Sequence, residues 1–309
     1  MKITTEDSST VLPDFLMVGA AKSGTTTLYH YLDKHPDVYF PKNVKEPHYF
    51  SFGNQSPQYS DSKFVEKLIW KTDDYVKLYK NAPTGAKIGD GSTSYLYNWH
   101  KAIENIKHLY GPSYRKLKIL IILRNPIDRA YSHYNFLLRN GLEHLPFETA
   151  LRPEVIAVRK DERWGFDYLE YGIYSQAIEQ YKLHFDNVKV FLFEDLAHPE
   201  MVSIELCNFL EIDPRIVLEF PRSNPSGRPK NSWLVHQLLR NASLKRAANL
   251  LPNSLKRNVL KKRDKVLQKV LEKPPLPQQI HDALCRYYEP SIRQLESLLG
   301  KNLTSWRNP

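Results

Sequence analysis

The stretch "MVGAAKSGTTTLYHYL", residues 17–32, decides the fold because it joins an apolar strand to a helix through a glycine-containing loop. Gly19 and Gly24 have the spacing of a nucleoside-triphosphate loop, but Thr25 stands where that motif requires lysine, and Lys22 lies inside the loop. Backbone N–H groups and the positive end of the helix converge at such a loop, which suits an anion. Further hydroxyl donors are Ser23, Thr25, Thr26 and Thr27. The stretch therefore predicts an anion-binding loop, and a plain strand-to-helix turn is the alternative.

Apolar stretches bounded by turn residues alternate with helical periodicity along the chain. This alternation indicates βα units and a parallel sheet flanked by helices. The expected strands cover 15–19, 86–90, 117–123 and 188–193, and the expected helices cover 25–35, 126–140, 172–185 and 199–210. We predict an α/β fold with a P-loop-like parallel sheet, in one domain over 1–309. A flexible N-terminus is expected over 1–12, and a mainly helical C-terminal part over 232–309, after a polar loop.

Composition narrows the class of protein. The chain has 309 residues, of which 41% are hydrophobic and 25% charged, as in ordinary folded soluble domains. Its longest apolar runs are far below the roughly 20 residues that span a bilayer, and no signal peptide is recognisable. Cys207 and Cys285 are the two cysteines, which favours buried thiols in a reducing compartment over disulfides or structural zinc. We expect a cytoplasmic protein without a transmembrane segment.

Positive charge is concentrated in one segment. Residues 228–273 hold 13 Lys or Arg against 2 acidic residues, a net of +11, whereas the rest holds 31 basic against 32 acidic residues, a net of −1. The segment is interpreted either as a solvated face of basic helices or as a surface for an anionic acceptor or a peripheral membrane contact. It contains a single aromatic residue, Trp233, and no recognition-helix pattern, so no nucleic-acid partner is expected. The oligomeric state is not predicted.

The strand at 117–123 ends in Arg124, followed by "NPIDRAYSHY". A nucleoside triphosphatase needs a carboxylate near this point to hold magnesium, whereas an arginine binds an anion and repels a cation. Asp128 falls in the first turn of the following helix, where an acidic residue favours the helix dipole, so its expected role is structural. Arg124 and Ser132 are predicted to bind a second phosphate, with no metal ion in the site.

The two segments "VGAAKSGTTTLYHYL" and "LRNPIDRAYSHY" together resemble the cofactor signatures of sulfotransferases that use 3′-phosphoadenosine 5′-phosphosulfate (PAPS). The resemblance is strongest to the branch shared by heparan sulfate sulfotransferases and many bacterial enzymes. It continues patchily through "KEPHYF", "FEDL" and the C-terminal "YYEPSIRQLESLLGKNLTSW", and so spans most of the chain. It implies that Lys22, Ser23, Gly24, Thr25, Thr26 and Thr27 hold the 5′-phosphosulfate. It implies equally that Arg124 and Ser132 bind the 3′-phosphate, with PAPS as co-substrate.

The segment "KEPHYF", residues 45–50, places Glu46 and His48 in an extended stretch where alternate side chains face one way. The resemblance implies that Glu46 is the base and that His48 is its neighbour or substitute; an exposed glutamate and a structural histidine are the alternative.

The loop "NPSGRPKNSW" resembles one that closes over the nucleotide, which implies phosphate contacts from Gly227, Arg228 and Lys230. A polar surface loop is the alternative there.

The segment "GDGSTSYLY", residues 89–97, corresponds to an acceptor-side motif in relatives that often begins with lysine or glutamate. This chain has Asp90 and Gly91 instead, so the identity of the acceptor cannot be transferred from those relatives.

The predicted function is transfer of a sulfuryl group from PAPS to a hydroxyl, with an amine as second choice, of a carbohydrate or glycan acceptor. Lys22 is the predicted catalytic cation, because charge builds on the phosphate oxygen that leaves. Two alternatives remain open. A P-loop kinase or nucleoside triphosphatase would bind ATP with magnesium, and a non-enzymatic module would bind polyanions or membrane surfaces through 228–273.

Overall fold

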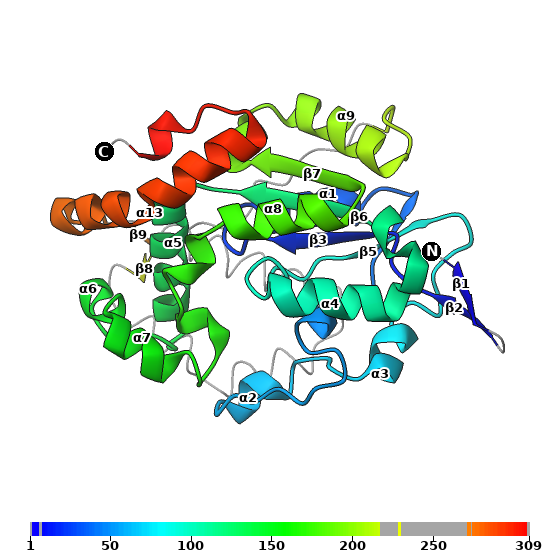
Figure 1. The fold of residues 1–309 in the computed structure, drawn as a ribbon, viewed down its shortest axis with the longest axis horizontal. Coiled ribbons are helices and arrows are strands. Elements are labelled where there is room, and N and C mark those ends of the chain that lie inside the picture. Colours follow the sequence, from blue (N-terminus) through cyan, green and yellow to red (C-terminus); the bar gives the residue numbers. More distant parts are fainter. Residues whose placement is uncertain (1, 6–7, 217–227, 230–270, 273, 308–309) are drawn as a thin grey trace.

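Five parallel strands form the centre of the protein in this computed structural model, which describes residues 2–5, 8–216, 228–229, 271–272 and 274–307. The strand order is β4-β5-β3-β6-β7. The strands are β3 (Phe15–Gly19), β4 (Val38–Tyr39), β5 (Lys87–Asp90), β6 (Lys118–Leu123) and β7 (Asn187–Leu192). Helices flank this sheet (Figure 1), so the predicted α/β class with a parallel sheet is confirmed.

The described helices are α1 (Thr25–Leu32), α2 (Ser62–Val65), α3 (Thr72–Lys77), α4 (Trp99–Tyr110), α5 (Pro126–Arg139), α6 (Phe147–Ala150), α7 (Pro153–Arg159), α8 (Ser175–His184), α9 (Pro199–Leu210) and α13 (Gln278–Leu299). The predicted helices α1, α5, α8 and α9 begin at or within three residues of their expected starts, whereas α2, α3, α4, α6 and α7 were not predicted. Proline opens α5 and α9, where its missing N–H would have no helical partner. Helix α13 confirms the helical C-terminal part, and residues 232–270 lie outside the described residues.

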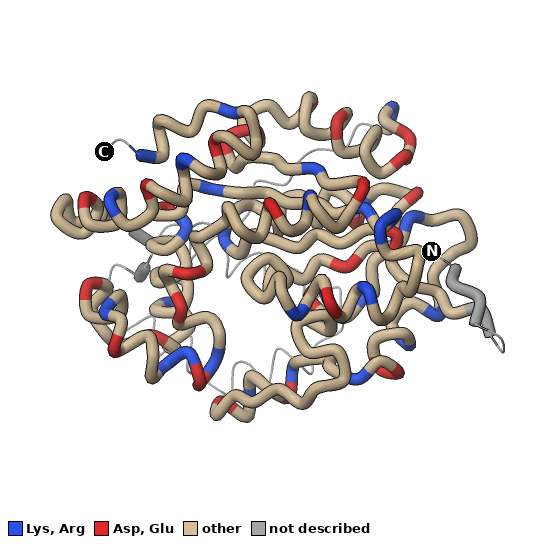
Figure 2. Tube along the Cα trace, in the orientation of Figure 1, with Lys and Arg blue, Asp and Glu red and all other residues tan. Residues whose placement is uncertain are grey.

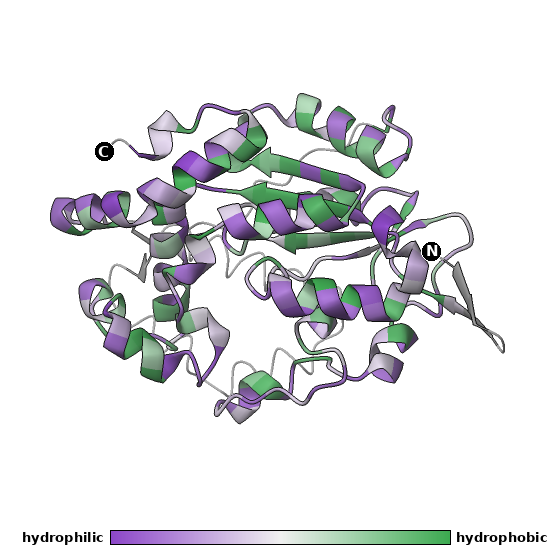
Figure 3. Cartoon of the chain, viewed as in Figure 1, coloured by the Kyte–Doolittle hydropathy of each residue, from purple (hydrophilic) through white to green (hydrophobic). Residues whose placement is uncertain are grey.

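Successive side chains of β3 and β6 point to opposite faces of the sheet, and each face has its own core. One core joins Leu16, Val18, Ile119 and Ile121 to residues of α4, α5, α8 and α13. The other joins Phe15, Met17, Leu120 and Ile122 to residues of α1 and α9. Figure 3 shows these strands as the most continuously apolar elements. Apolarity on both faces explains why their sequences read as unbroken hydrophobic runs.

All five strands run in the same direction, so their carboxyl ends meet at one edge of the sheet. The loop 20–24 follows β3 and leads into α1 at this edge. Arg124 follows β6 here, and α5 begins at once because the side chain of Asn125 accepts the backbone N–H of Ile127 at 2.9 Å. In open α/β sheets this edge is where ligands bind.

Three regions add to what the sequence predicts or lie largely outside the described residues. Where a flexible N-terminus is expected over 1–12, β1 (Lys2–Thr5) pairs antiparallel with β2 (Ser8–Val11), and threonine and valine favour such extended backbone. Strand β4 was not predicted, because two residues are too few to show a period. The predicted loop at 222–231 lies outside the described residues, except for β8 (Arg228–Pro229), which pairs with β9 (Leu271–Glu272) and contacts α5.

Surface charge is mixed over the described part of the chain. Helices α4 and α13 each carry both signs (Figure 2). The basic segment 228–273 lies outside the described residues apart from the short β8 and β9, so neither interpretation of it is tested. Among the described helices, none has the length and apolarity required to cross a bilayer. Cys207 is buried and Cys285 partly buried, and both are free thiols.

Candidate active site

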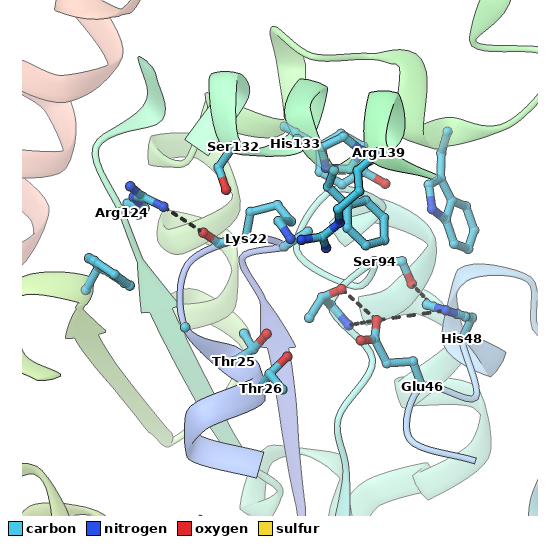
Figure 4. Close-up of a pocket in the computed structure, with 17 residues that line it drawn as sticks. Lys22, Thr25, Thr26, Glu46, His48, Ser94, Arg124, Ser132, His133 and Arg139 are labelled. Carbon is cyan, nitrogen blue, oxygen red and sulfur yellow. Dashed lines mark hydrogen bonds and ion pairs between the residues drawn. The ribbon is translucent and has the colours of Figure 1, made fainter. Parts of the chain in front are cut away.

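A pocket of about 430 Å³ opens at the carboxyl edge of the sheet, between the loop 20–24, the stretch 45–50 and helix α5 (Figure 4). Eight of the predicted site residues line it: Lys22, Gly24, Thr25, Thr26, Glu46, His48, Arg124 and Ser132. They come from segments that are far apart in the sequence, so their convergence is a result of the sheet topology.

The loop at the N-terminus of α1 depends on Gly24. Its backbone has φ of 99°, which strains any residue with a side chain, and a Cβ atom built there would also lie 2.7 Å from Cδ1 of Leu196, so glycine is favoured. The N-terminus of α1 thus lies beside the hydroxyls of Thr25 and Thr26, which line the pocket. Ser23 is fully buried and Thr27 partly exposed; neither lines the pocket, and their phosphosulfate contacts stay predictions.

Lys22 is held in the left-handed region of the backbone, with φ of 71°. Its Nζ lies 4.3 Å above the ring of Phe136. Burial, followed by repulsion from Arg139, Arg124 and Lys45, lowers the pKa of Lys22 to about 8. An ammonium placed among other cations is costly unless an anion joins it, so the unliganded site favours an anionic ligand.

Arg124 forms a second cationic point at the tip of β6. Its guanidinium donates to the carbonyl oxygen of Lys22 at 3.5 Å and pairs with Asp128 at 3.3 Å, while its Nε is buried and lacks a partner among the described residues. The guanidinium also lies 4.6 Å from the ring centre of Phe193. Ser132, two turns along α5, lines the same part of the pocket. Asp128 is therefore an ion-pair partner of Arg124, which agrees with a structural role.

Glu46 faces the pocket from the opposite side. One carboxylate oxygen accepts from the ammonium of Lys45 at 3.1 Å, and the other accepts from the hydroxyl of Thr93 at 2.7 Å and from its N–H at 3.3 Å. Burial acts to raise the pKa of Glu46, but Lys45, His48 and Thr93 together lower it below its usual value. The carboxylate is therefore ionised at neutral pH and fixed in orientation.

His48 lies beside Glu46, with its Nε2 at 3.9 Å from the carboxylate. Its backbone has φ of 64°, which ends the predicted extended stretch, and its N–H donates to Ser92 Oγ at 2.9 Å. The ring Nδ1 lies 2.8 Å from Ser94 Oγ. Burial lowers the pKa of His48 despite the opposing charge of Glu46, so the imidazole is neutral at neutral pH. Its contacts orient it toward the same pocket as Glu46 (Figure 4).

Asp90, at the start of the acceptor-side segment, does not line the pocket. It is buried and accepts hydrogen bonds from Ser92 at 2.6 Å, Tyr95 at 2.8 Å and Tyr75 at 3.0 Å. Burial raises its pKa to about 6 against these hydrogen bonds. Ser92 in turn accepts the backbone N–H of His48, so Asp90 fixes the position of His48 indirectly, through Ser92.

Nine further lining residues were not predicted: Ala21, Thr93, Ser94, His133, Phe136, Arg139, Trp164, Tyr171 and Phe193. Phe136 and Arg139 follow Ser132 at spacings of four and seven, so one face of α5 carries all three and the helical period was an available signal. His133 also lies on α5, and the remaining residues come from loops and short 3₁₀ helices. Of the predicted nucleotide loop, Gly227 and Lys230 lie outside the described residues, and only the backbone of Arg228 is described.

Comparison with known proteins gives a consistent result. The family described as "Sulfotransferase domain" matches residues 12–233. The membrane-associated sulfotransferase kil1 of Dictyostelium discoideum is 29% identical over 159 residues, 48% of this chain and 30% of that protein. Human heparan sulfate glucosamine 3-O-sulfotransferase 3A1 is 26% identical over 181 residues, 58% of this chain and 39% of that protein. The chain thus matches well under half the length of these curated relatives.

A solved structure is also similar. The crystal structure of a sulfotransferase from Alicyclobacillus acidocaldarius aligns with a TM-score of 0.70 at 26% identity, over 96% of this chain and 100% of that one. The similarity therefore extends beyond the two motif segments to the architecture as a whole.

Proposed function

Because the chain belongs to the sulfotransferase domain family, we propose that it transfers a sulfuryl group from PAPS to a hydroxyl of a carbohydrate or glycan acceptor. An amine is the second candidate for the accepting group. One observation carries the proposal: the Lys22 loop, Arg124 and the ionised Glu46 line a single pocket. The glycan acceptor is supported by the heparan sulfate relatives and stays part of the proposal.

The pocket offers two separate positions for anions. We assign Lys22, Thr25, Thr26 and the N-terminus of α1 to the 5′-phosphosulfate, since they combine a cation, hydroxyls and backbone donors. We assign Arg124 and Ser132 to the 3′-phosphate, because the buried N–H donor at Nε of Arg124 has no acceptor among the described residues. PAPS, when bound, supplies the sulfuryl group.

The opposite wall suits the acceptor. An attacking hydroxyl must lose its proton, and Glu46 is an ionised carboxylate whose two oxygens are held by Lys45 and Thr93. The proton of the acceptor passes to Glu46 as the new oxygen–sulfur bond forms. Negative charge then grows on the phosphate oxygen that leaves, where the Lys22 ammonium and the N–H groups of α1 stabilise it.

The kinase or triphosphatase alternative fits these residues less well. It requires a carboxylate at the tip of β6 to hold magnesium, and that position is Arg124. The nearby Asp128 is paired with this arginine. The polyanion-binding alternative rests on 228–273, outside the described residues, and predicts salt-sensitive binding that survives Lys22→Ala.

Calorimetry tests the proposal directly. We expect 3′-phosphoadenosine 5′-phosphate (PAP) to bind without magnesium and ATP to gain little from adding it. Tight binding of ATP only with magnesium, and none of PAP, would exclude the proposal. Transfer of label from PAPS is then measured with three acceptors. Chitotetraose is neutral, unsulfated chondroitin carries carboxylates, and the chitosan tetramer carries amines.

Replacement of Arg124 by alanine should weaken PAP binding by about 10- to 100-fold, since hydrogen bonds to charged groups each contribute roughly 1.5–3 kcal/mol. The affinity for AMP, which lacks the 3′-phosphate, should stay the same. Asp128→Asn is the matched control, because it removes the competing ion pair while leaving the guanidinium; PAP should bind it at least as tightly. An equal loss for PAP and AMP in Arg124→Ala would show that this arginine does not read the 3′-phosphate.

A further inference from the structure

Lys45 lies next to the pocket and contacts one residue on each of its two walls. Its Nζ lies 3.1 Å from the hydroxyl oxygen of Thr26 and 3.1 Å from a carboxylate oxygen of Glu46. Both of these partners line the pocket, whereas Lys45 itself does not. The ammonium is partly buried and lies 5.5 Å from the ring centre of Tyr29. One cation thus joins the first turn of α1 to the carboxylate on the opposite wall.

We propose that Lys45 is a positioning residue that ties Glu46 to the anion-binding loop, so that donor and base are held at a fixed separation. The inference rests on the proposed function, because it assumes that the loop holds the phosphosulfate and that Glu46 takes the proton. Lys45 touches neither substrate in this scheme and acts through Thr26 and Glu46.

The direction of the hydrogen bonds supports this role. An ammonium only donates, so the oxygen of Thr26 must accept from Lys45 and its own O–H is left to donate elsewhere. Thr26 lines the pocket, so that donor is available to an anion in the loop. Glu46 accepts from Lys45 through one oxygen and from Thr93 through the other, which fixes the plane of the carboxylate.

Charge supports it as well. Burial raises the pKa of Glu46, and Lys45 is the strongest of the groups that lower it, ahead of His48 and Thr93. The other titratable groups that interact with this pair are Lys22 across the pocket and Tyr29 and His30 on α1. Without the Lys45 charge, the effect of burial, which raises the pKa of Glu46, is less fully offset, so this pKa must rise.

A titration of the Glu46 carboxyl by ¹³C NMR tests the proposal without any acceptor. The signal is assigned with Glu46→Gln in otherwise wild-type protein. We expect Lys45→Met and Lys45→Gln to raise the pKa of Glu46 and Lys45→Arg to preserve it. Lys42→Met, an exposed lysine on the same stretch, is the matched control and should leave the titration unchanged.

Kinetics supply the second readout, with PAPS as donor and chitotetraose as probe acceptor. Misplacement of a catalytic group commonly costs up to about 100-fold in rate, so kcat in Lys45→Met should fall by about 10- to 100-fold. The affinity for PAP should change by less than about 3-fold, because the phosphate contacts remain. The acidic limb of the pH profile should move upward, and Lys45→Arg should restore most of the rate.

An unchanged Glu46 titration in Lys45→Met would overturn the proposal, as would equal losses of kcat and PAP affinity. If the methionine variant does not fold, Lys45→Gln decides, since it keeps a polar N–H donor and removes the charge. Failure of the wild type to bind PAP would count against the proposed function instead. The titration in the unliganded protein would still decide whether Lys45 controls Glu46.

Discussion

Lys22→Ala should lower kcat for sulfuryl transfer by about 10²- to 10³-fold, because removal of one pre-organised donor to developing charge commonly costs about 3–4 kcal/mol. Lys22 is the cation inside the loop and lines the pocket together with Thr25 and Thr26 (Figure 4). Steady-state rates with labelled PAPS measure the effect. Lys34→Ala, which removes an exposed lysine just after α1, is the matched control and should keep the wild-type rate.

The stability of the same variant should move in the opposite direction. Burial and the neighbouring cations lower the pKa of Lys22 to about 8 from its ordinary value of 10.5. Between these two pH values the unfolded chain binds the proton more readily than the folded one, so the free energy of unfolding rises with pH across this window. Below about pH 8 Lys22 is charged in the folded state, and burying this charge destabilises the folded state by its full amount.

Urea unfolding at pH 7 and pH 9.5 measures this contribution. Lys22→Ala should be at least as stable as the wild type at pH 7. Its free energy of unfolding should also increase less between the two pH values, because the contribution of Lys22 is absent. If the variant loses activity but is more stable than the wild type, the lysine is present to bind a ligand and does not stabilise the fold. A clear drop in stability at pH 7 would instead make Lys22 a structural part of the loop.

Most of the fold could be predicted because its signals are local. The strands β3 and β6 are buried on both faces and read as continuous apolar runs, and prolines mark the starts of α5 and α9. The short strand β4 left no such signal. It is held by pairing with β5, a contact between segments about 50 residues apart that no local pattern encodes.

The cationic side of the pocket was predictable for the same reason. Lys22, Thr25 and Thr26 follow one strand, and Arg124 follows its neighbour in the sheet, so parallel topology brings them to one edge. On the opposite wall, Glu46 and His48 were predicted and line the pocket, but the side chains around them were not predicted. Trp164 and Tyr171 reach the pocket through a separate aromatic cluster built on long-range packing, which has no period in the sequence.

Backbone conformation was a second feature that local patterns did not reveal. Among the described residues, non-glycine residues with positive φ are Lys22, His48, Asn54 and Glu211. Lys22 and His48 both line the pocket. Residues held in sparsely populated backbone regions tend to occur at functional sites, where the surrounding structure imposes the conformation. The extended stretch predicted for 45–50 is interrupted at His48, two residues after Glu46.

Glu46→Gln should reduce kcat by about 10²- to 10⁴-fold, the usual range for loss of a positioned general base. Glutamine keeps the size of the side chain and can still accept from Thr93, but it cannot take a proton from the acceptor. The affinity for PAP should change by less than about 3-fold, because the phosphate contacts come from other residues. Glu66→Gln, an exposed glutamate on the nearby segment after α2, is the matched control.

The pH profile separates Glu46 from His48 as the base. The pKa of Glu46 is lowered, so the wild-type rate should fall on the acidic side only below the usual range of a glutamate, and Glu46→Gln should lack that limb. His48→Gln should keep the limb and lose less activity, because the imidazole lies 3.9 Å from the carboxylate and acts beside it. If His48→Gln abolishes transfer while Glu46→Gln retains it, the proton passes to the histidine. Glu46 would then orient that ring, and the ionised carboxylate held by Lys45 would serve the histidine rather than the acceptor.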